Sequence, residues 1–454
     1  MINRTDHIRK FYRGLWYPVL VAGLVFAGHL TGWDVPFAAA VLISAIPGLL
    51  VMHDAEFLLA PFMMVTFTVT ARYYDGDYHY ERYLQKPWSM IAIAAAAATL
   101  AALVWFLFRN RRSVNRLKQP SVFISLAVLS AVMAFNGSFN PVYTPKNLAF
   151  AAYFALSTVF VYLLFALYGN FDRTAADRFL SCVVVTGILI LAELIAAYFT
   201  RVKFSEGTIV KESVVVGWGV WTSVGGMLAF LMPAPFYFAR WHRHGWAFYL
   251  LGLAMFAGTL FSQSRGALLV GGVSLLICLA LVCAGGPNRR MNRIFTSVLV
   301  AVGAVGALLL SRRFRVLIQN FADYGFGDNG RFALWQAGWK HFLTYPVFGS
   351  GFYDSYVSEW NFVVYPYLYH NTLVQMLAAC GAAGLLAYLW HRFVTARLVL
   401  QNRNVPKTFM GVCILGLLLF SLIDVLFFKT YPTVIYAIML VYMETSGQKD
   451  GEPL

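Results

Sequence analysis

Charged residues are scarce in this chain of 454 residues. Asp, Glu, Lys and Arg together make up 12% of it, whereas hydrophobic residues make up 60% and the mean hydropathy is +0.65. Apolar runs of about 18 residues, long enough to cross a bilayer as helices, recur from end to end. Helices satisfy their backbone polar groups internally, as the bilayer core requires. The sequence therefore predicts an all-α polytopic membrane protein and excludes a string of soluble domains.

Cysteines and metal-binding patterns are also poorly represented. The five cysteines all fall inside predicted spans, and none forms a Cys-x-x-Cys pair. No His-Glu-x-x-His, P-loop or dinucleotide-binding pattern occurs, so neither a metal nor an organic cofactor is expected. Asp75-Gly76-Asp77 offers carboxylates for a divalent ion, but a solvated turn is the favoured interpretation.

Acidic residues are too few to balance the basic ones. The chain has 20 Asp and Glu against 35 Lys and Arg, a formal net charge of +15. The basic residues concentrate in alternate short loops, which the positive-inside rule assigns to the cytoplasm. No basic run is interleaved with aromatic residues, so nucleic acid is not an expected partner. Anionic membrane lipids suit these cations instead.

We expect 12–14 transmembrane helices, even in number, with both termini in the cytoplasm. Three regions result: a transmembrane helical bundle over 1–310, a large extracytoplasmic loop with short helices over 311–370, and C-terminal transmembrane helices with a cytoplasmic tail over 371–454. The first apolar run follows basic residues but lacks a small-residue cleavage site, so we expect a retained helix. The candidate spans are 15–31, 35–52, 55–71, 88–108, 120–137, 148–168, 179–199, 216–238, 245–261, 267–284, 294–310, 371–390, 408–427 and 430–445.

Two polar fragments in the second half of the chain stand out against this apolar background. Arg265 opens the run Arg-Gly-Ala-Leu-Leu, and His370-Asn371 precedes another apolar span. Both lie where a span meets the same outer aqueous face. Arginine keeps its charge there, and histidine can take up a proton near neutral pH. The pair suits chemistry on an anionic, lipid-carried substrate, although a snorkelling arginine and a helix-capping histidine are the structural alternatives.

The predicted outer loop has parts of different character. Residues 311–320 mix basic and apolar residues as an interfacial amphipathic helix does, and 331–340 predict a second short helix. Residues 353–369 are rich in tyrosine and include Trp360. Aromatic faces of this kind bind sugars, and they also pack small caps onto membranes. The sequence leaves these two interpretations equally open.

Four ordered motifs give the chain a specific resemblance. They are Arg265 to Leu269 after Ser-Gln-Ser, Arg331 to Trp335, Pro346 to Gly351 as Pro-x-x-Gly-x-Gly, and His370 to Gly384 as His-Asn-x9-Gly-x-x-Gly. The set, which covers about 120 residues, resembles the O-antigen ligase and polymerase superfamily, and within it the lipopolysaccharide O-antigen ligases.

This resemblance implies a metal-independent membrane glycosyltransferase of the GT-C type. It implies transfer of a glycan from undecaprenyl diphosphate, the donor, to a terminal sugar of lipid A–core, the acceptor. The reaction would take place on the periplasmic face of the bacterial inner membrane.

The residues themselves suggest a division of labour. Arg265 can stabilise the leaving diphosphate through its planar fork of donors, in the role that a metal ion has elsewhere. His370 can take the proton from the acceptor hydroxyl as that oxygen attacks the anomeric carbon, which would invert this centre. Alternatively, His370 binds phosphate or orients the acceptor. The sequence does not separate these roles.

Other residues are weaker candidates for the same site. Arg201, Lys203 and Arg331 are outward cations that could bind the diphosphate, although interface anchoring or loop bracing explains them as well. Tyr369, Asn371 and Trp335 are expected to contact the acceptor or to support the site. Glu193 and Asp424 are acids inside predicted spans, where charge is expensive, but the sequence assigns them no role in catalysis.

Two rival functions remain. An O-antigen polymerase or a protein O-oligosaccharyltransferase would use the same donor with another acceptor. A lipid-linked glycan transporter would show internal repeats and ionisable residues along a midplane path. The sequence shows no clear internal repeat, and its polar motifs gather at one face.

Overall fold

The computed structural model describes residues 4–68, 88–112, 117, 120–140, 143, 145–205, 208–217, 219–309, 330–352 and 369–445. The expected amphipathic helix at 311–320, the aspartates Asp75 and Asp77, and all but the last residue of the tyrosine-rich segment lie outside these residues.

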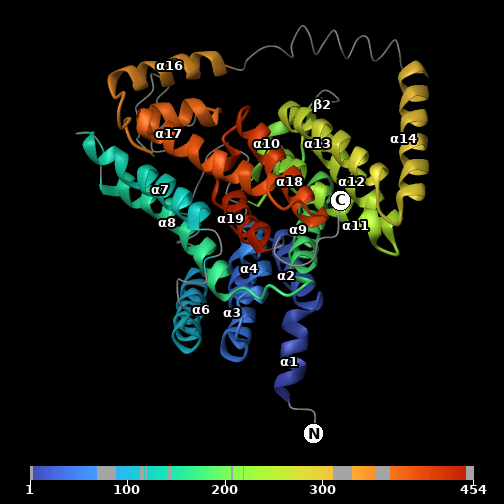
Figure 1. The fold of residues 1–454 in the computed structure, drawn as a ribbon, viewed down its shortest axis with the longest axis horizontal. Coiled ribbons are helices and arrows are strands. Elements are labelled where there is room, and N and C mark those ends of the chain that lie inside the picture. Colours follow the sequence, from blue (N-terminus) through green and yellow to red (C-terminus); the bar gives the residue numbers. More distant parts are fainter. Residues whose placement is uncertain are drawn as a thin grey trace.

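Helices make up nearly all of the described regular structure (Figure 1). The N-terminal half contains α1 (Arg4–Arg13), α2 (Trp16–Thr31), α3 (Asp34–Val51), η1 (Glu56–Leu58), α4 (Leu59–Met64), η2 (Val65–Phe67), α6 (Ser89–Arg109), α7 (Pro120–Phe135), η4 (Asn136–Phe139), α8 (Pro145–Tyr168) and α9 (Ala175–Thr200). The C-terminal half contains η5 (Lys211–Ser213), α10 (Trp221–Leu231), α11 (Pro233–Trp241), α12 (Gly245–Phe261), α13 (Arg265–Ala284), α14 (Arg289–Leu309), α16 (Arg331–Thr344), α17 (Thr372–Leu400), α18 (Val405–Ser421), η6 (Leu426–Phe428) and α19 (Thr430–Thr445).

Two short hairpins are the strands of the described chain, and both lie between α9 and α10. In the first, β1 (Phe204–Ser205) pairs antiparallel with β2 (Thr208–Ile209). In the second, β3 (Val215–Val216) pairs antiparallel with β4 (Gly219–Val220). They carry the chain from the end of α9 to the start of α10, so both helix ends lie at the same end of the bundle.

The expected class, an all-α polytopic membrane protein, is confirmed. Eight helices of the described chain are long and apolar enough to cross a membrane, or nine if the bent pair α1 and α2 forms one span. Every expected span contains helix in its described residues, although span 216–238 begins in the hairpin of β3 and β4. The number of helices that qualify as spans is below the expected 12–14. Segment 55–71 is divided into η1, α4 and η2, and three apolar helices, Glu56–Phe67, Gly245–Phe261 and Val405–Ser421, are shorter than a full span.

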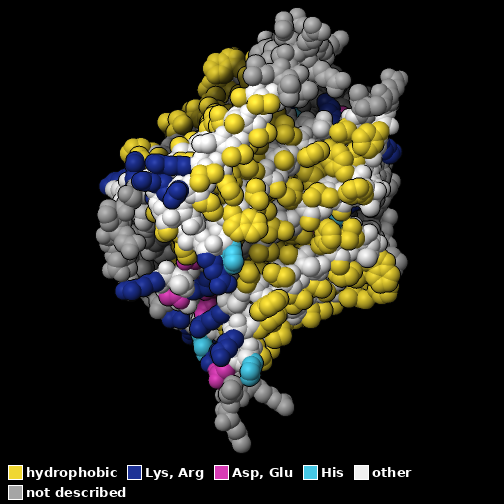
Figure 2. All heavy atoms as spheres, turned by 90° about the vertical axis from the view of Figure 1, so that its right-hand side faces the viewer, with side chains coloured by type: hydrophobic (Ala, Val, Ile, Leu, Met, Phe, Trp, Pro, Cys, Tyr) yellow, Lys and Arg dark blue, Asp and Glu magenta, His cyan; other side chains and the backbone are white. Residues whose placement is uncertain are grey.

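The most buried helices occupy the centre of the bundle. Of the 18 most apolar consecutive residues in the span Trp221–Trp241, which comprises α10 and α11, 94% are buried. The corresponding share in α6 is 11%. Figure 1 shows α6 beside α3 at one edge and α14 beside α13 at another. Figure 2 shows the side of the molecule that includes α14. A broad hydrophobic surface covers it, with Lys and Arg side chains along one edge. An apolar surface of this extent suits contact with lipid chains.

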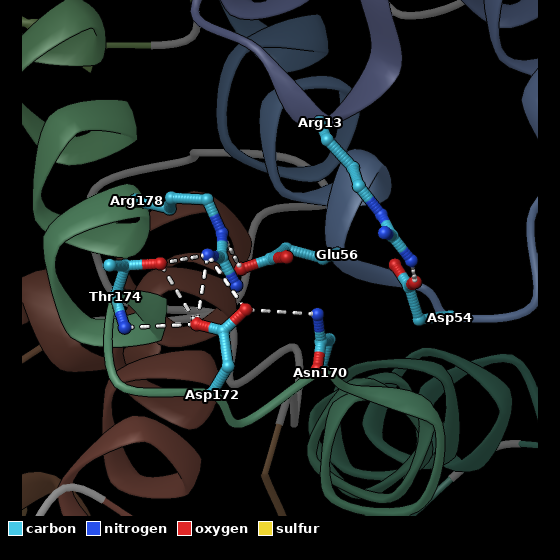
Figure 3. Close-up of polar contacts among 7 residues, drawn as sticks. All are labelled: Arg13, Asp54, Glu56, Asn170, Asp172, Thr174 and Arg178. Atoms are coloured by element: carbon cyan, nitrogen blue, oxygen red, sulfur yellow. Dashed lines mark hydrogen bonds and ion pairs between the residues drawn. The ribbon is translucent and has the colours of Figure 1, made fainter. Parts of the chain in front are cut away.

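A cluster of ion pairs closes the end of the bundle where the basic loops predict the cytoplasm (Figure 3). The Nε atom of Arg178 lies 2.7 Å from Glu56 Oε1, and its Nη1 atom lies 2.9 Å from Asp172 Oδ1. Arg13 pairs with Asp54 at 2.9 Å. Burial raises the pKa of Asp172, but hydrogen bonds from Arg178 and Thr174 outweigh it, so the pKa is lowered. These contacts fasten α1 and α9 to the turns beside them.

Candidate active site

The start of α13 presents Arg265 at the end of the bundle opposite the ion-pair cluster. Ser264 caps the helix, because its Oγ atom accepts a hydrogen bond from Ala267 N at 3.2 Å. The Arg265 side chain is exposed. A Cβ atom on Gly266 would lie 2.8 Å from Ile423 Cγ2, so the absence of a side chain lets α13 approach the turn after α18 closely. Arg265 is thereby placed beside the segment that carries Asp424.

His370 lies in the turn before α17, with a backbone φ of 50°. Its Nδ1 atom is 3.1 Å from Asp424 Oδ1, and its side chain is 42% exposed. An imidazole that uses Nδ1 for a carboxylate has Nε2 left for a substrate. The structure therefore joins two residues that are 54 positions apart and that the sequence did not connect.

Asp424 is the acid that fixes this histidine, and it is buried. Its Oδ1 atom also accepts a hydrogen bond from Val425 N at 2.7 Å. Burial raises its pKa, but the hydrogen bond from His370, the charge of Lys429 and a hydrogen bond from Thr222 lower it by more. The carboxyl group is therefore ionised at neutral pH. Lys429 in turn donates to Ser223 Oγ near the start of α10.

Asn371 and Thr372 bind the start of α17 to the end of α18. The Asn371 side chain caps α17 by accepting from Leu373 N at 2.9 Å, and its Nδ2 atom donates to Leu422 O at 3.0 Å. Thr372 Oγ1 donates to Ser421 O at 2.7 Å. Asn371 is therefore placed as a supporting residue of the His370–Asp424 contact.

Tyr369 and Trp335 dock α16 onto α17, and Figure 1 shows these two helices side by side. Trp335 Nε1 donates to Tyr369 O at 3.0 Å, and the hydroxyl of buried Tyr369 lies 2.5 Å from His341 Nδ1. Burial lowers the pKa of His341. Gln375 Oε1 accepts from Tyr369 N at 3.0 Å. These contacts set the position of the residue immediately before His370.

The two glycine-containing motifs of the sequence interlock. Gly381 has a φ of 64° and breaks α17. Segment 346–351 enters at this break: Ser350 N donates to Ala378 O at 3.0 Å, and Gly351 N donates to Ala379 O at 2.8 Å. Gly349 has a φ of 74°, and a Cβ atom there would lie 2.3 Å from the Ala379 carbonyl carbon. Glycine is therefore required by both the backbone conformation and the close approach.

The other cations that the sequence proposes for the site are Arg201, Lys203 and Arg331. Arg201 follows α9, and its Nη2 atom lies 3.1 Å from His29 Nδ1. It is three residues beyond Tyr198, whose hydroxyl donates to Phe261 O just before the turn to α13. The exposed Lys203 belongs to the hairpin segment, and its backbone N–H donates to Ser213 Oγ at 2.9 Å. Arg331 is the first residue of α16, one turn before Trp335.

Sequence reasoning overlooked several members of this group. The sequence marks Asp424 only as an acid within an apolar run, and it gives no indication of a role for Lys429 or His29. A charged residue in the break between two apolar helices is the signal that could have identified Asp424 and Lys429. Within the described ranges, no three His, Cys, Asp or Glu side chains come together as a metal site would require.

A comparison with known proteins relates one part of the chain to a protein family. Residues 250–389 match the sequence model of a family described as O-Antigen ligase. The matched segment covers less than half of the chain, and it includes Arg265, Arg331 and His370. Asp424, Arg201 and Lys203 lie outside it. No curated protein matches the chain.

Proposed function

We propose that this chain is a lipopolysaccharide O-antigen ligase, because its residues 250–389 match the model of the O-antigen ligase family. It would be a GT-C-type enzyme that transfers a glycan from undecaprenyl diphosphate to a terminal sugar of lipid A–core. It would act at the periplasmic face of the bacterial inner membrane. The observation that carries the proposal is the contact of His370 with buried Asp424, next to the turn on which Arg265 is placed.

In the proposed reaction His370 is the general base. Its Nε2 atom accepts the proton of the acceptor hydroxyl while that oxygen forms a bond to the anomeric carbon of the donor sugar. Ionised Asp424 stabilises the imidazolium that results, and its hydrogen bond keeps the proton on Nδ1. The attack is direct, so the configuration at the anomeric carbon inverts.

The leaving group of this reaction is lipid diphosphate. The bond from the anomeric carbon to the phosphate oxygen breaks as the new glycosidic bond forms, and negative charge grows on that oxygen. Arg265, exposed at the start of α13, is proposed to stabilise this charge through paired hydrogen bonds. Arg201, Lys203 and Arg331 are proposed to bind the rest of the diphosphate.

The acceptor side rests on the loop that precedes α17. Tyr369, Asn371 and Trp335 all make contacts that hold His370, so we propose supporting roles for them. An O-antigen polymerase or a protein O-oligosaccharyltransferase would use the same donor site, and His370 as a phosphate ligand would alter only the proton transfer. A transporter is disfavoured because His370, Asp424 and Arg265 gather at one end of the bundle.

A deletion strain tests the choice of acceptor. Loss of a ligase leaves lipid A–core without polysaccharide while lipid-linked polymer accumulates. Loss of a polymerase leaves a single repeat unit on the core, which would contradict the proposal. Restoration by the wild-type gene, but not by a gene encoding His370→Ala, ties the phenotype to this site.

A further inference from the structure

A buried acid and a buried histidine lie directly behind Arg201. His29 is in the last turn of α2, and Glu193 is two turns before the end of α9. Both side chains have an exposed fraction of 0%, and His29 Nδ1 lies 3.5 Å from Glu193 Oε2. The Nη2 atom of Arg201 contacts the same imidazole at both ring nitrogens. The three side chains thus form one cluster, in which Arg201 follows the end of α9.

The chemistry of these groups decides which atoms donate and which accept between Arg201 and His29. A guanidinium group only donates hydrogen bonds, so the nitrogen of His29 that it contacts has to accept. The Nη2 atom of Arg201 lies near both ring nitrogens of His29, and a neutral imidazole has one nitrogen that can accept from it. Glu193 Oε2 lies 3.5 Å from His29 Nδ1, beside the ring that Arg201 contacts.

Packing of α2 against α9 does not by itself account for Glu193. Neither of its carboxylate oxygens accepts a hydrogen bond from any residue that the structure describes. A buried carboxyl group of this kind destabilises the fold, and an apolar side chain of the same size would pack α2 and α9 together at lower cost. An ionisable residue within a membrane helix is more often there for function. Glu193 Oε2 lies 3.5 Å from His29 Nδ1, which in turn is beside Arg201.

Arg201 itself is tied to the candidate active site. Tyr198 is one turn before it on α9, and the Tyr198 hydroxyl donates to Phe261 O at the end of α12. Phe261 is separated from Arg265 by the short turn that begins α13. The end of α9 is therefore tied to the turn before α13, and the Arg201 guanidinium that follows it contacts His29.

We propose that His29 and Glu193 are positioning residues that hold the Arg201 guanidinium for the diphosphate of the lipid-linked donor. The inference rests on the proposed function, because it takes the donor to be a lipid diphosphate. If these two residues position Arg201, their substitution should weaken donor binding more than it lowers turnover. Removal of a hydrogen bond to a charged group lowers affinity about tenfold.

The experiment uses full-length protein in liposomes, with undecaprenyl diphosphate and undecaprenyl monophosphate as binding probes. His29→Leu should raise the donor KM and weaken undecaprenyl diphosphate binding about tenfold, with kcat within about twofold of wild type. His29→Gln, whose amide oxygen can accept from Arg201, should recover part of this loss. Glu193→Leu should weaken diphosphate binding more than Glu193→Gln. Monophosphate binding should change less than diphosphate binding in every variant.

Two buried residues elsewhere in the bundle provide matched controls. His391 is fully buried and contacts Ser125 and Tyr436, and Glu444 is buried and accepts from Tyr162 at 2.5 Å. His391 and Glu444 make the contacts just described with residues other than Arg201, so His391→Gln and Glu444→Gln should leave diphosphate affinity within about twofold of wild type. Equal losses in these controls would mean that buried polar residues act through stability alone, and the inference would be wrong.

A double-mutant cycle decides between positioning and general destabilisation. In an Arg201→Ala background, His29→Leu should weaken diphosphate binding no further, because the group that it positions is gone. Additive losses would overturn the inference. The outcome is separable from that of the proposed function: a wild-type protein that binds undecaprenyl diphosphate in a His29-dependent way but transfers no glycan would refute the ligase and keep the positioning role.

Discussion

The carboxylate of Asp424 lies 3.1 Å from the Nδ1 atom of His370, so the break after α18 meets the start of α17 at a hydrogen bond. One partner is buried and the other is partly exposed. This is the geometry in which an acid orients a base for a substrate. The role of His370 can therefore be tested through Asp424, a second residue whose side chain is buried.

Asp424→Asn removes the charge while it keeps the size of the side chain. If Asp424 stabilises the imidazolium, kcat should fall about a hundredfold, with donor affinity little changed. Asp54→Asn, at the opposite end of the bundle, is the matched control and should keep wild-type kcat. The depressed pKa of Asp424 means that its charge is present above the ordinary carboxyl pKa and is lost only as the pH falls through the lowered value. The acid limb of the rate profile should therefore not be set by Asp424. A wild-type kcat in Asp424→Asn would contradict the orienting role.

His370→Ala distinguishes a base from a phosphate ligand. As a base, His370 should contribute roughly a hundredfold to ten-thousandfold in turnover, and its loss should leave donor binding intact. Turnover at saturating donor and affinity for undecaprenyl diphosphate are measured on the same liposome preparation. Loss of binding with normal turnover would identify His370 as a ligand of the diphosphate.

Arg265 is tested by grading its charge and shape. Arg265→Lys keeps a positive charge but loses the planar fork, and Arg265→Ala loses both. Activity should fall in the order wild type, Lys, Ala, and the alanine variant should be about a hundred- to a thousandfold slower. Arg178→Lys, in the ion-pair cluster of Figure 3, reports the effect of the same exchange on stability alone. Equal activity in all three forms at position 265 would remove Arg265 from the mechanism.

Metal independence is tested with a chelator. If arginines stabilise the leaving diphosphate, purified protein should transfer glycan at an unchanged rate in excess EDTA. The comparison is the same preparation with added magnesium or manganese. A complete loss of activity that either ion restores would contradict this prediction and would return attention to Asp75 and Asp77.

Topology is tested by thiol labelling. Ala333 is exposed on α16, and Arg403 is exposed between α17 and α18. With Cys283, the one partly exposed natural cysteine, replaced by serine, Ala333→Cys should react with a membrane-impermeant reagent from the periplasm. Arg403→Cys should react only after the membrane is opened. The reverse pattern would overturn both the topology and the proposed place of the reaction.

The sequence predicted the helices well because span length is a property of the bilayer. Each apolar run contains helix in its described part, and the errors lie where a break interrupts a run, as in segment 55–71, or where strands begin it, as in 216–238. Such breaks depend on neighbouring helices: Tyr168 O accepts from Ala55 N, for example, which no local pattern indicates.

The candidate site could be predicted only in part. Arg265 and His370 stand out because each begins a helix at a membrane boundary. Asp424 and Lys429 acquire their roles through contacts with distant segments, and His29 does so through Arg201. Contacts between single residues that are far apart in the chain produce no periodic pattern of residue types in the sequence. The supporting contact of Trp335 with the Tyr369 carbonyl is of the same kind.

The segment that enters the break of α17 also has a mechanical consequence. Gly351 is bonded to the first half of that helix, and Ala382, at the start of the second half, donates to Pro346 O at 2.8 Å. Neither half can slide along its axis without carrying residues 346–351 with it. His370, at the head of the first half, therefore shares one rigid frame with residues 346–351. If the proposed function holds, sequence changes on the exposed face of α16 would leave the Nε2 atom of His370 in place, so the choice of sugar could change without a change in the position of the base.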